Sequence, residues 1–261
     1  MAEIKFYGEN GLTFLIAKRL YEKGNLSYFI NEIYFLEGPP PQPVDGDFDI
    51  FLFFCFGRSS RLDPEYDRKD DKYLVTFGEP DMIISIPDLL LFFEVKTGEI
   101  EPYRASPLML RKGIWYEIVR FYYAGQCFYE NKPLESHGHV EFRYPSKIRF
   151  RGLTETKEQS ITFRYRQKEH SAIFAAFKKM LSRSRDFRVI VLSSDKEAKA
   201  ISKLKEGIQG INSLSADKFD LNRIGWVGEE KIKRLFGDDI TFDSTFLHPI
   251  YCRDETYNSS R

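Results

Sequence analysis

The chain has 261 residues, with 39 basic and 39 acidic side chains and a formal net charge of zero. Hydrophobic residues make up 42% and charged residues 30% of it, which excludes a disordered polyelectrolyte and predicts a folded chain with a substantial core. The longest apolar run, residues 50–56, is too short for a membrane-spanning helix.

Apolar periodicity and turn residues divide the first half of the chain into helices and strands. Residues 10–23 have helical spacing and end at Gly24, and residues 26–36 are expected to form a second helix. A proline-rich stretch then predicts a loop. The strands expected in this half are 48–56, 73–77, 82–86 and 89–95.

The second half is expected to continue the alternation of helices and strands. The expected helices are 106–124, 171–183, 195–208 and 228–236. The expected strands are 140–144, 147–151, 160–166 and 188–192. This order predicts an α/β fold with a mixed central sheet flanked by helices.

We expect residues 1–210 to form one domain with a β segment inserted at 127–168. We expect residues 211–261 to be a C-terminal extension, to which the sequence assigns no role.

The zero net charge hides an uneven distribution along the chain. Residues 1–144 have a net charge of −7, residues 145–206 of +9, and residues 207–261 of −2. A segment as basic as the middle one could follow a phosphate backbone. A lysine- and arginine-rich solvated surface is the alternative reading.

The stretch from Gly78 to Lys96 places two carboxylates and a lysine among strongly apolar residues. Pro87-Asp88 separates two apolar runs and predicts a hairpin, in which Asp81 lies opposite Glu94. Glu94 and Lys96 are two residues apart on one strand and share a face. Two close carboxylates repel each other unless a proton or cation intervenes, and Mg²⁺ suits oxygen ligands. The alternative is a plain salt bridge between Lys96 and one acid.

These residues resemble the signature of the PD-(D/E)xK nuclease superfamily, which is also called restriction-endonuclease-like. The chain supplies Pro80-Asp81 and then Glu94-Val95-Lys96 at the ends of two adjacent apolar strands. The order helix, three strands, helix, strand also resembles the core of that superfamily. The resemblance covers about residues 1–125 and the strand at 188–192, and it leaves the inserted β segment and the extension unexplained.

The resemblance implies a metal-dependent endonuclease that hydrolyses phosphodiester bonds, with DNA favoured over RNA. Asp81, Glu94 and the Val95 carbonyl would hold Mg²⁺, for which Mn²⁺ should substitute. Glu9-Asn10 followed by Thr13 resembles the opening of the first helix in some groups, so Glu9 is expected as a third acid. A favourable charge at the helix N-terminus is the other explanation for Glu9. Lys96 would position the attacking water and stabilise developing charge.

Two groups of basic residues are candidates for nucleic-acid binding. Arg111, Lys112 and Arg120 belong to the helix after the Glu-x-Lys strand, where the superfamily often places substrate contacts. In the inserted segment, basic residues alternate with Phe150, Phe163 and Tyr165, a pattern that could hold a backbone or stack bases. The basic residues of this second group are Arg149, Arg151, Arg164 and Arg166. A solvated arginine face above buried aromatics would give the same alternation.

A catalytically inactive nucleic-acid-binding or assembly module on the same fold is the second functional hypothesis, although it would not need all of Asp81, Glu94 and Lys96. A homodimer is compatible with the resemblance, since many members dimerise to cut two strands. The first six residues lack the pattern of a secretory signal, and three dispersed cysteines without CxxC argue against a disulfide framework. We therefore expect a cytoplasmic protein.

Overall fold

The arrangement of helices and strands comes from a computed structural model of the chain. It describes residues 3–24, 26–41, 48–52, 65–67, 72–75, 79–104, 113–130, 139–150, 153–165, 186–215, 217–242 and 247–251. No helix within these ranges is both long and apolar enough to cross a membrane.

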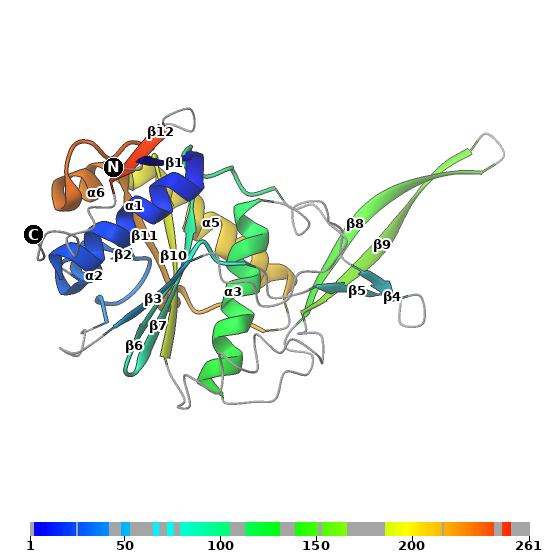
Figure 1. Cartoon of the computed structure of the whole chain (residues 1–261). Coiled ribbons are helices and arrows are strands. Elements are labelled where there is room, and N and C mark those ends of the chain that lie inside the picture. Colours follow the sequence, from blue (N-terminus) through cyan, green and yellow to red (C-terminus); the bar gives the residue numbers. More distant parts are fainter. Residues whose placement is uncertain are drawn as a thin grey trace, which may run out of the picture.

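A mixed six-stranded sheet forms the centre of the molecule, in the order β2-β11-β10-β7-β6-β3 (Figure 1). Its strands are β2 (Tyr34–Phe35), β3 (Asp49–Leu52), β6 (Met82–Ile86), β7 (Leu89–Val95), β10 (Asp186–Ser193) and β11 (Ile224–Gly228). Strands β7, β10 and β11 are parallel, while β3, β6 and β7 alternate in direction. The expected α/β class with a mixed central sheet is confirmed.

Helices cover both faces of this sheet. They are α1 (Gly8–Lys23), α2 (Leu26–Glu32), α3 (Ile114–Tyr129), α5 (Glu197–Leu214) and α6 (Glu229–Phe236). One buried cluster joins α1, α2 and α6 to residues such as Ile84 and Phe93. The other joins α3 and α5 to Ile83 and Phe92. Because side chains alternate along a strand, each sheet face has its own apolar core.

Close packing holds α3 against the second face. Gly125 of α3 lies directly over the Phe187 ring of β10, where any larger residue would overlap that ring. Phe92 of β7 stacks on Phe121 of the same helix, with ring centroids 6.4 Å apart. The glycine therefore lets α3 approach the strands that carry the acidic motif.

The hairpin of β6 and β7 has the predicted register. Met82 pairs with Phe93 and Ile86 with Leu89, and the bounds of both strands match the expected ones. Both strands are buried at every position, as a central pair covered on two faces should be.

The C-terminal segment contributes strands to two sheets. Strand β11 is hydrogen-bonded between β10 and β2 in the central sheet, and Trp226 and Val227 belong to the two cores. Farther along the chain, β12 (Leu247–Tyr251) pairs with β1 (Glu3–Tyr7). The described part of residues 211–261 therefore adds β11 to the central sheet and core, and β12 to a separate two-stranded sheet with β1.

The inserted segment forms longer strands than the sequence suggested. Strands β8 (His139–Phe150) and β9 (Leu153–Tyr165) are antiparallel along their whole length. They join β4 (Glu65–Asp67) and β5 (Lys72–Val75) in a second sheet, of order β4-β5-β9-β8. The β8–β9 hairpin projects away from the body of the molecule (Figure 1). The helix expected at 171–183 lies outside the described residues.

Candidate active site

Asp81 and Glu94 lie at one end of the β6–β7 hairpin. The Asp81 N–H donates to the Phe93 carbonyl at 3.1 Å, and Asp81 Oδ2 accepts from the Val95 N–H at 2.7 Å. These bonds hold Asp81, one residue before the first ladder pair of Met82 and Phe93, against the end of β7 that carries Glu94. Both belong to the sheet face on which Ile83, Phe92 and helix α3 pack.

Lys96 connects the acids of this end of the sheet. Its Nζ lies 2.8 Å from Glu94 Oε1 and 3.3 Å from Glu9 Oε2. Glu9 belongs to the first turn of α1. The Lys96 backbone N–H donates to the Leu192 carbonyl of β10 at 2.8 Å, which fixes the start of the lysine side chain. The structure therefore brings together the four side chains expected from the sequence, namely Asp81, Glu94, Lys96 and Glu9.

Burial sets the protonation behaviour of this group. The Glu94 side chain is 7% exposed, and burial together with neighbouring Asp81 raises its pKa well above the usual range. Burial also raises the pKa of Asp81 to about 7, against the lowering effects of the Val95 N–H and Lys96. Burial therefore disfavours the ionised forms of both carboxyls unless a proton or a cation compensates their charge.

Lys96 has the opposite tendency. Burial disfavours its ammonium form, but Glu94 and then Glu9 and Asp81 outweigh this effect and raise its pKa. Lys96 therefore stays positively charged and acts as a hydrogen-bond donor instead of a general base.

Glu117 on α3 belongs to the same electrostatic group and was not among the expected site residues. Burial raises its pKa, while Arg120 and Lys96 lower it, and its charge acts on both Asp81 and Glu94. The sequence could have indicated Glu117, because this residue lies within one helical turn of the buried Ile114 and Phe121. A carboxylate beside the apolar stripe of a helix points toward the core edge instead of open water.

The expected nucleic-acid-binding residues are placed only in part. Arg120 lies on α3, pairs with Glu117 at 3.0 Å and covers the Tyr116 ring at 4.4 Å, so it borders the acids. Arg149 and Arg164 occupy positions in β8 and β9. Arg111, Lys112, Arg151 and Arg166 lie outside the described residues. Their roles stay predictions.

The available oxygen ligands decide whether a metal cation fits the site. Among the described residues, no group of three or more carboxylate, histidine or cysteine side chains lies close enough to enclose a metal ion. Asp81, Glu94 and the Val95 carbonyl nevertheless offer oxygen ligands, and a cation beside them would favour the ionised forms of the two acids. Mg²⁺ is often held by one or two carboxylates and keeps several waters. The oxygens present fit that mode of binding. They do not form a site in which protein ligands alone surround the ion.

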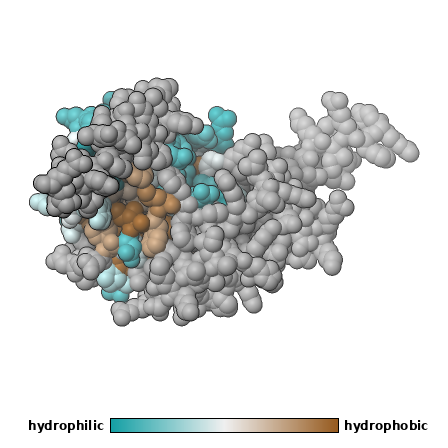
Figure 2. Space-filling model, in the orientation of Figure 1, coloured by the Kyte–Doolittle hydropathy of each residue, from teal (hydrophilic) through white to brown (hydrophobic). Residues whose placement is uncertain are grey.

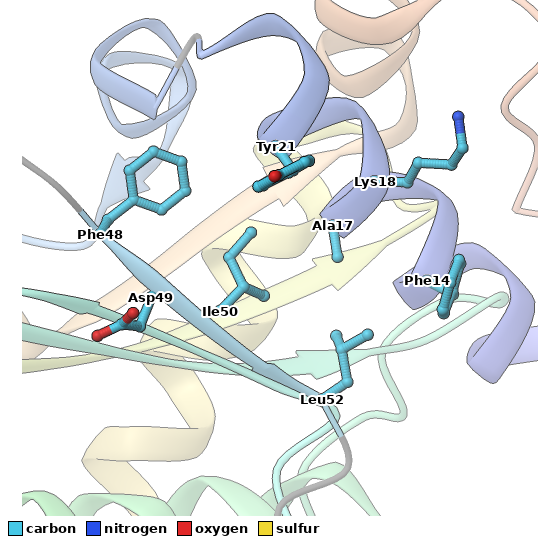
Figure 3. A pocket seen from close by; sticks show the side chains of 8 residues that line it. All are labelled: Phe14, Ala17, Lys18, Tyr21, Phe48, Asp49, Ile50 and Leu52. Atoms are coloured by element: carbon cyan, nitrogen blue, oxygen red, sulfur yellow. The ribbon is translucent and has the colours of Figure 1, made fainter. Parts of the chain in front are cut away.

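An apolar hollow lies on the other face of the sheet. It has a volume of about 440 Å³, and Figure 3 shows its lining side chains on α1 and β3. Figure 2 shows apolar side chains gathered on that side of the molecule. Ile50 and Leu52 of the hollow pack on the core of α1, not on the core of α3. The hollow is therefore separated by the sheet from Asp81 and Glu94.

Comparisons with models of protein families, with curated proteins and with solved structures find no match to this chain. The geometry of the site and the fold therefore carry the functional argument.

Proposed function

We propose that the protein is a metal-dependent nuclease of the PD-(D/E)xK type that hydrolyses phosphodiester bonds in DNA. The observation that carries the proposal is the end of the β6–β7 hairpin, where Asp81 accepts from the Val95 N–H next to Glu94, and Lys96 contacts Glu94. The order α1, β3, β6, β7, α3, β10 supports it, because it is the order of elements in that superfamily.

Asp81, Glu94 and the Val95 carbonyl would hold Mg²⁺ or Mn²⁺, with Glu9 at the open side. The bound cation supplies Lewis-acid polarisation of the phosphate and a more acidic water. Lys96, held as an ammonium by Glu94, donates hydrogen bonds to that water or to a phosphate oxygen. Its charge also stabilises the negative charge that develops on the phosphorus oxygens.

A second candidate is a nucleic-acid-binding module without catalysis. The contacts of Lys96 with both Glu94 and Glu9 favour it, because an internal ammonium already compensates part of the charge that a metal would neutralise. The remaining excess of buried carboxylates argues for the enzyme.

The test is cleavage of supercoiled, linear, single-stranded and branched DNA in Mg²⁺ or Mn²⁺. The wild-type protein should cleave at least one of them, and Glu94→Ala and Lys96→Ala should not. Glu99→Gln is the matched control, because Glu99 is an exposed acid three residues beyond Lys96 that pairs with Lys199. Equal cleavage by both site variants would contradict the site, and binding without cleavage on every substrate would favour the second candidate.

A further inference from the structure

The outer part of the β8–β9 hairpin is a two-stranded ribbon. Strand β5 pairs with β9 only from Thr162 to Tyr165. Beyond these pairs, residues 143–150 and 153–160 have only each other as neighbours among the described strands. Eight residues of antiparallel strand span roughly 27 Å. Figure 1 shows this part reaching well beyond the central sheet and its helices.

The register sorts the ribbon residues onto two faces. One face has Arg143, Pro145, Lys147 and Arg149, paired with Ser160, Glu158, Thr156 and Thr154. It therefore combines three basic residues with one acid and three hydroxyl residues. The opposite face has Tyr144, Ser146, Ile148 and Phe150, paired with Gln159, Lys157, Glu155 and Leu153, and has no net charge. We call the first of these the basic face.

Chain connectivity limits the distance between the inner end of the β8–β9 hairpin and the acidic site. Val75, at the end of β5, pairs with Tyr165 of β9. Asp81 follows Val75 by six residues. Six residues of fully extended chain span at most about 22 Å, so Val75, which pairs with β9 below the ribbon, lies within that reach of Asp81. A polymer bound at the acids could therefore also meet the ribbon.

We propose that the ribbon is an arm that binds duplex DNA through its basic face, next to the place where the acids act. This inference rests on the proposed nuclease function for the location of the cut. The major groove of B-DNA admits a two-stranded β-ribbon, and arginine, lysine and hydroxyl side chains are the usual partners of phosphates. Alternate residues of a strand recur at about 6.8 Å, which equals two base-pair steps of about 3.4 Å along the axis of the duplex.

The experiment measures binding of a labelled duplex in EDTA, where hydrolysis is blocked, between about 50 and 200 mM salt. The variant combines Arg143→Gln, Lys147→Gln and Arg149→Gln. The matched control combines Lys18→Gln, Lys233→Gln and Arg234→Gln, three ion-paired cations on α1 and α6. The ribbon variant should lose at least about tenfold in affinity, and its slope of log affinity against log salt should shrink by about 2–3. The control should keep the wild-type slope.

Equal slopes in the two triple variants would overturn the arm. An equal loss on single-stranded and duplex DNA would overturn the assignment to a duplex. A protein that cleaves in Mg²⁺ and keeps wild-type binding in the ribbon variant refutes the arm alone. A protein that never cleaves but loses duplex binding in the ribbon variant refutes the nuclease and keeps the arm. Absence of any DNA binding by the wild-type protein refutes both.

Discussion

A buried aspartate, Asp195, and the acidic group of Asp81, Glu94 and Glu117 lie at the same end of the central sheet, but their hydrogen-bond partners differ. The Asp195 carboxylate, fully buried, accepts from the Ile100 N–H, the Ser193 hydroxyl and Lys203 Nζ at 2.5, 3.0 and 2.7 Å. Lys203 in turn donates to the Ile100 carbonyl at 2.6 Å. This group fastens the segment after β7 to β10 and α5.

The group of Asp81, Glu94 and Glu117 has three carboxyls, and the pKa of each is raised by burial. Its cations are Lys96 and Arg120. A buried carboxylate with several donors is explained by the fold that it stabilises. Carboxylates that are buried with too few hydrogen-bond donors or cations lower the stability of the fold. Such a cost in stability is characteristic of functional sites. The contrast between the two groups supports the proposed function.

The largest expected effect is on catalysis. Glu94→Gln keeps the shape of the side chain but removes a charged ligand, so the cleavage rate should fall by about 10²–10³-fold. Initial rates of plasmid nicking in Mg²⁺ measure it, with Glu99→Gln as the control. A rate within a factor of about two of wild type would remove Glu94 from the site.

The next largest effect is on stability and should appear in the group of Asp195 and Lys203. Asp195→Asn leaves Lys203, 13% exposed, without its buried carboxylate partner, and should lower the free energy of unfolding by about 2–4 kcal/mol. Asp81→Asn removes an unfavourably buried charge and should leave stability at about pH 8 unchanged or higher. Urea unfolding measures the free energy of unfolding of both variants. A larger loss for Asp81→Asn than for Asp195→Asn would contradict the difference between the two groups.

The pH dependence of stability provides a third test. The folded-state pKa of Asp81, about 7, exceeds its usual value of 3.8, and that of Glu94 is also raised. The folded state therefore binds more protons than the unfolded state between these values. The free energy of unfolding should rise as the pH falls from about 8 to about 5, by up to about 1 kcal/mol per pH unit.

Urea unfolding across this range measures the slope, and the double variant Asp81→Asn, Glu94→Gln is the control. Its slope should be flatter than that of the wild type. The same slope in both proteins would mean that other groups dominate the titration.

The smallest effect is expected at Glu9. Its side chain is 39% exposed, and it lies farther from Lys96 Nζ than Glu94 does. Water screens such a pair, so Glu9→Gln should reduce the cleavage rate less than about tenfold. A loss as large as that of Glu94→Gln would show that Glu9 is a full ligand instead of an accessory acid.

The sequence contains enough local information to predict the hairpin and its register. A two-residue turn at Pro87-Asp88 between two apolar runs leaves one pairing that buries both strands, and that pairing begins at Met82 and Phe93, the residues next to Asp81 and Glu94. Strand β10 was also expected, because Val189 to Leu192 are an unbroken aliphatic run.

Other features depend on contacts between distant segments. Strand β11 reads Ile-Gly-Trp-Val-Gly, and its two glycines weaken any local strand signal, although the close approach of Ile33 and Ile190 to Gly225 explains one of them. Glu117 joins the acids only because α3 packs across β7. The interrupted aromatic and basic pattern of residues 140–166 suggested three short strands, whereas continuous pairing makes two long ones.

Binding of Mn²⁺, followed by electron paramagnetic resonance, tests the central assignment most directly. At about pH 8, where proton competition is weakest, the wild-type protein and Glu99→Gln should bind Mn²⁺, and added Mg²⁺ should displace it. The double variant Asp81→Asn, Glu94→Gln should lose this binding while remaining folded. Wild-type Mn²⁺ affinity in the double variant, or no Mn²⁺ binding by the wild-type protein, would contradict a catalytic cation site at the end of the β6–β7 hairpin.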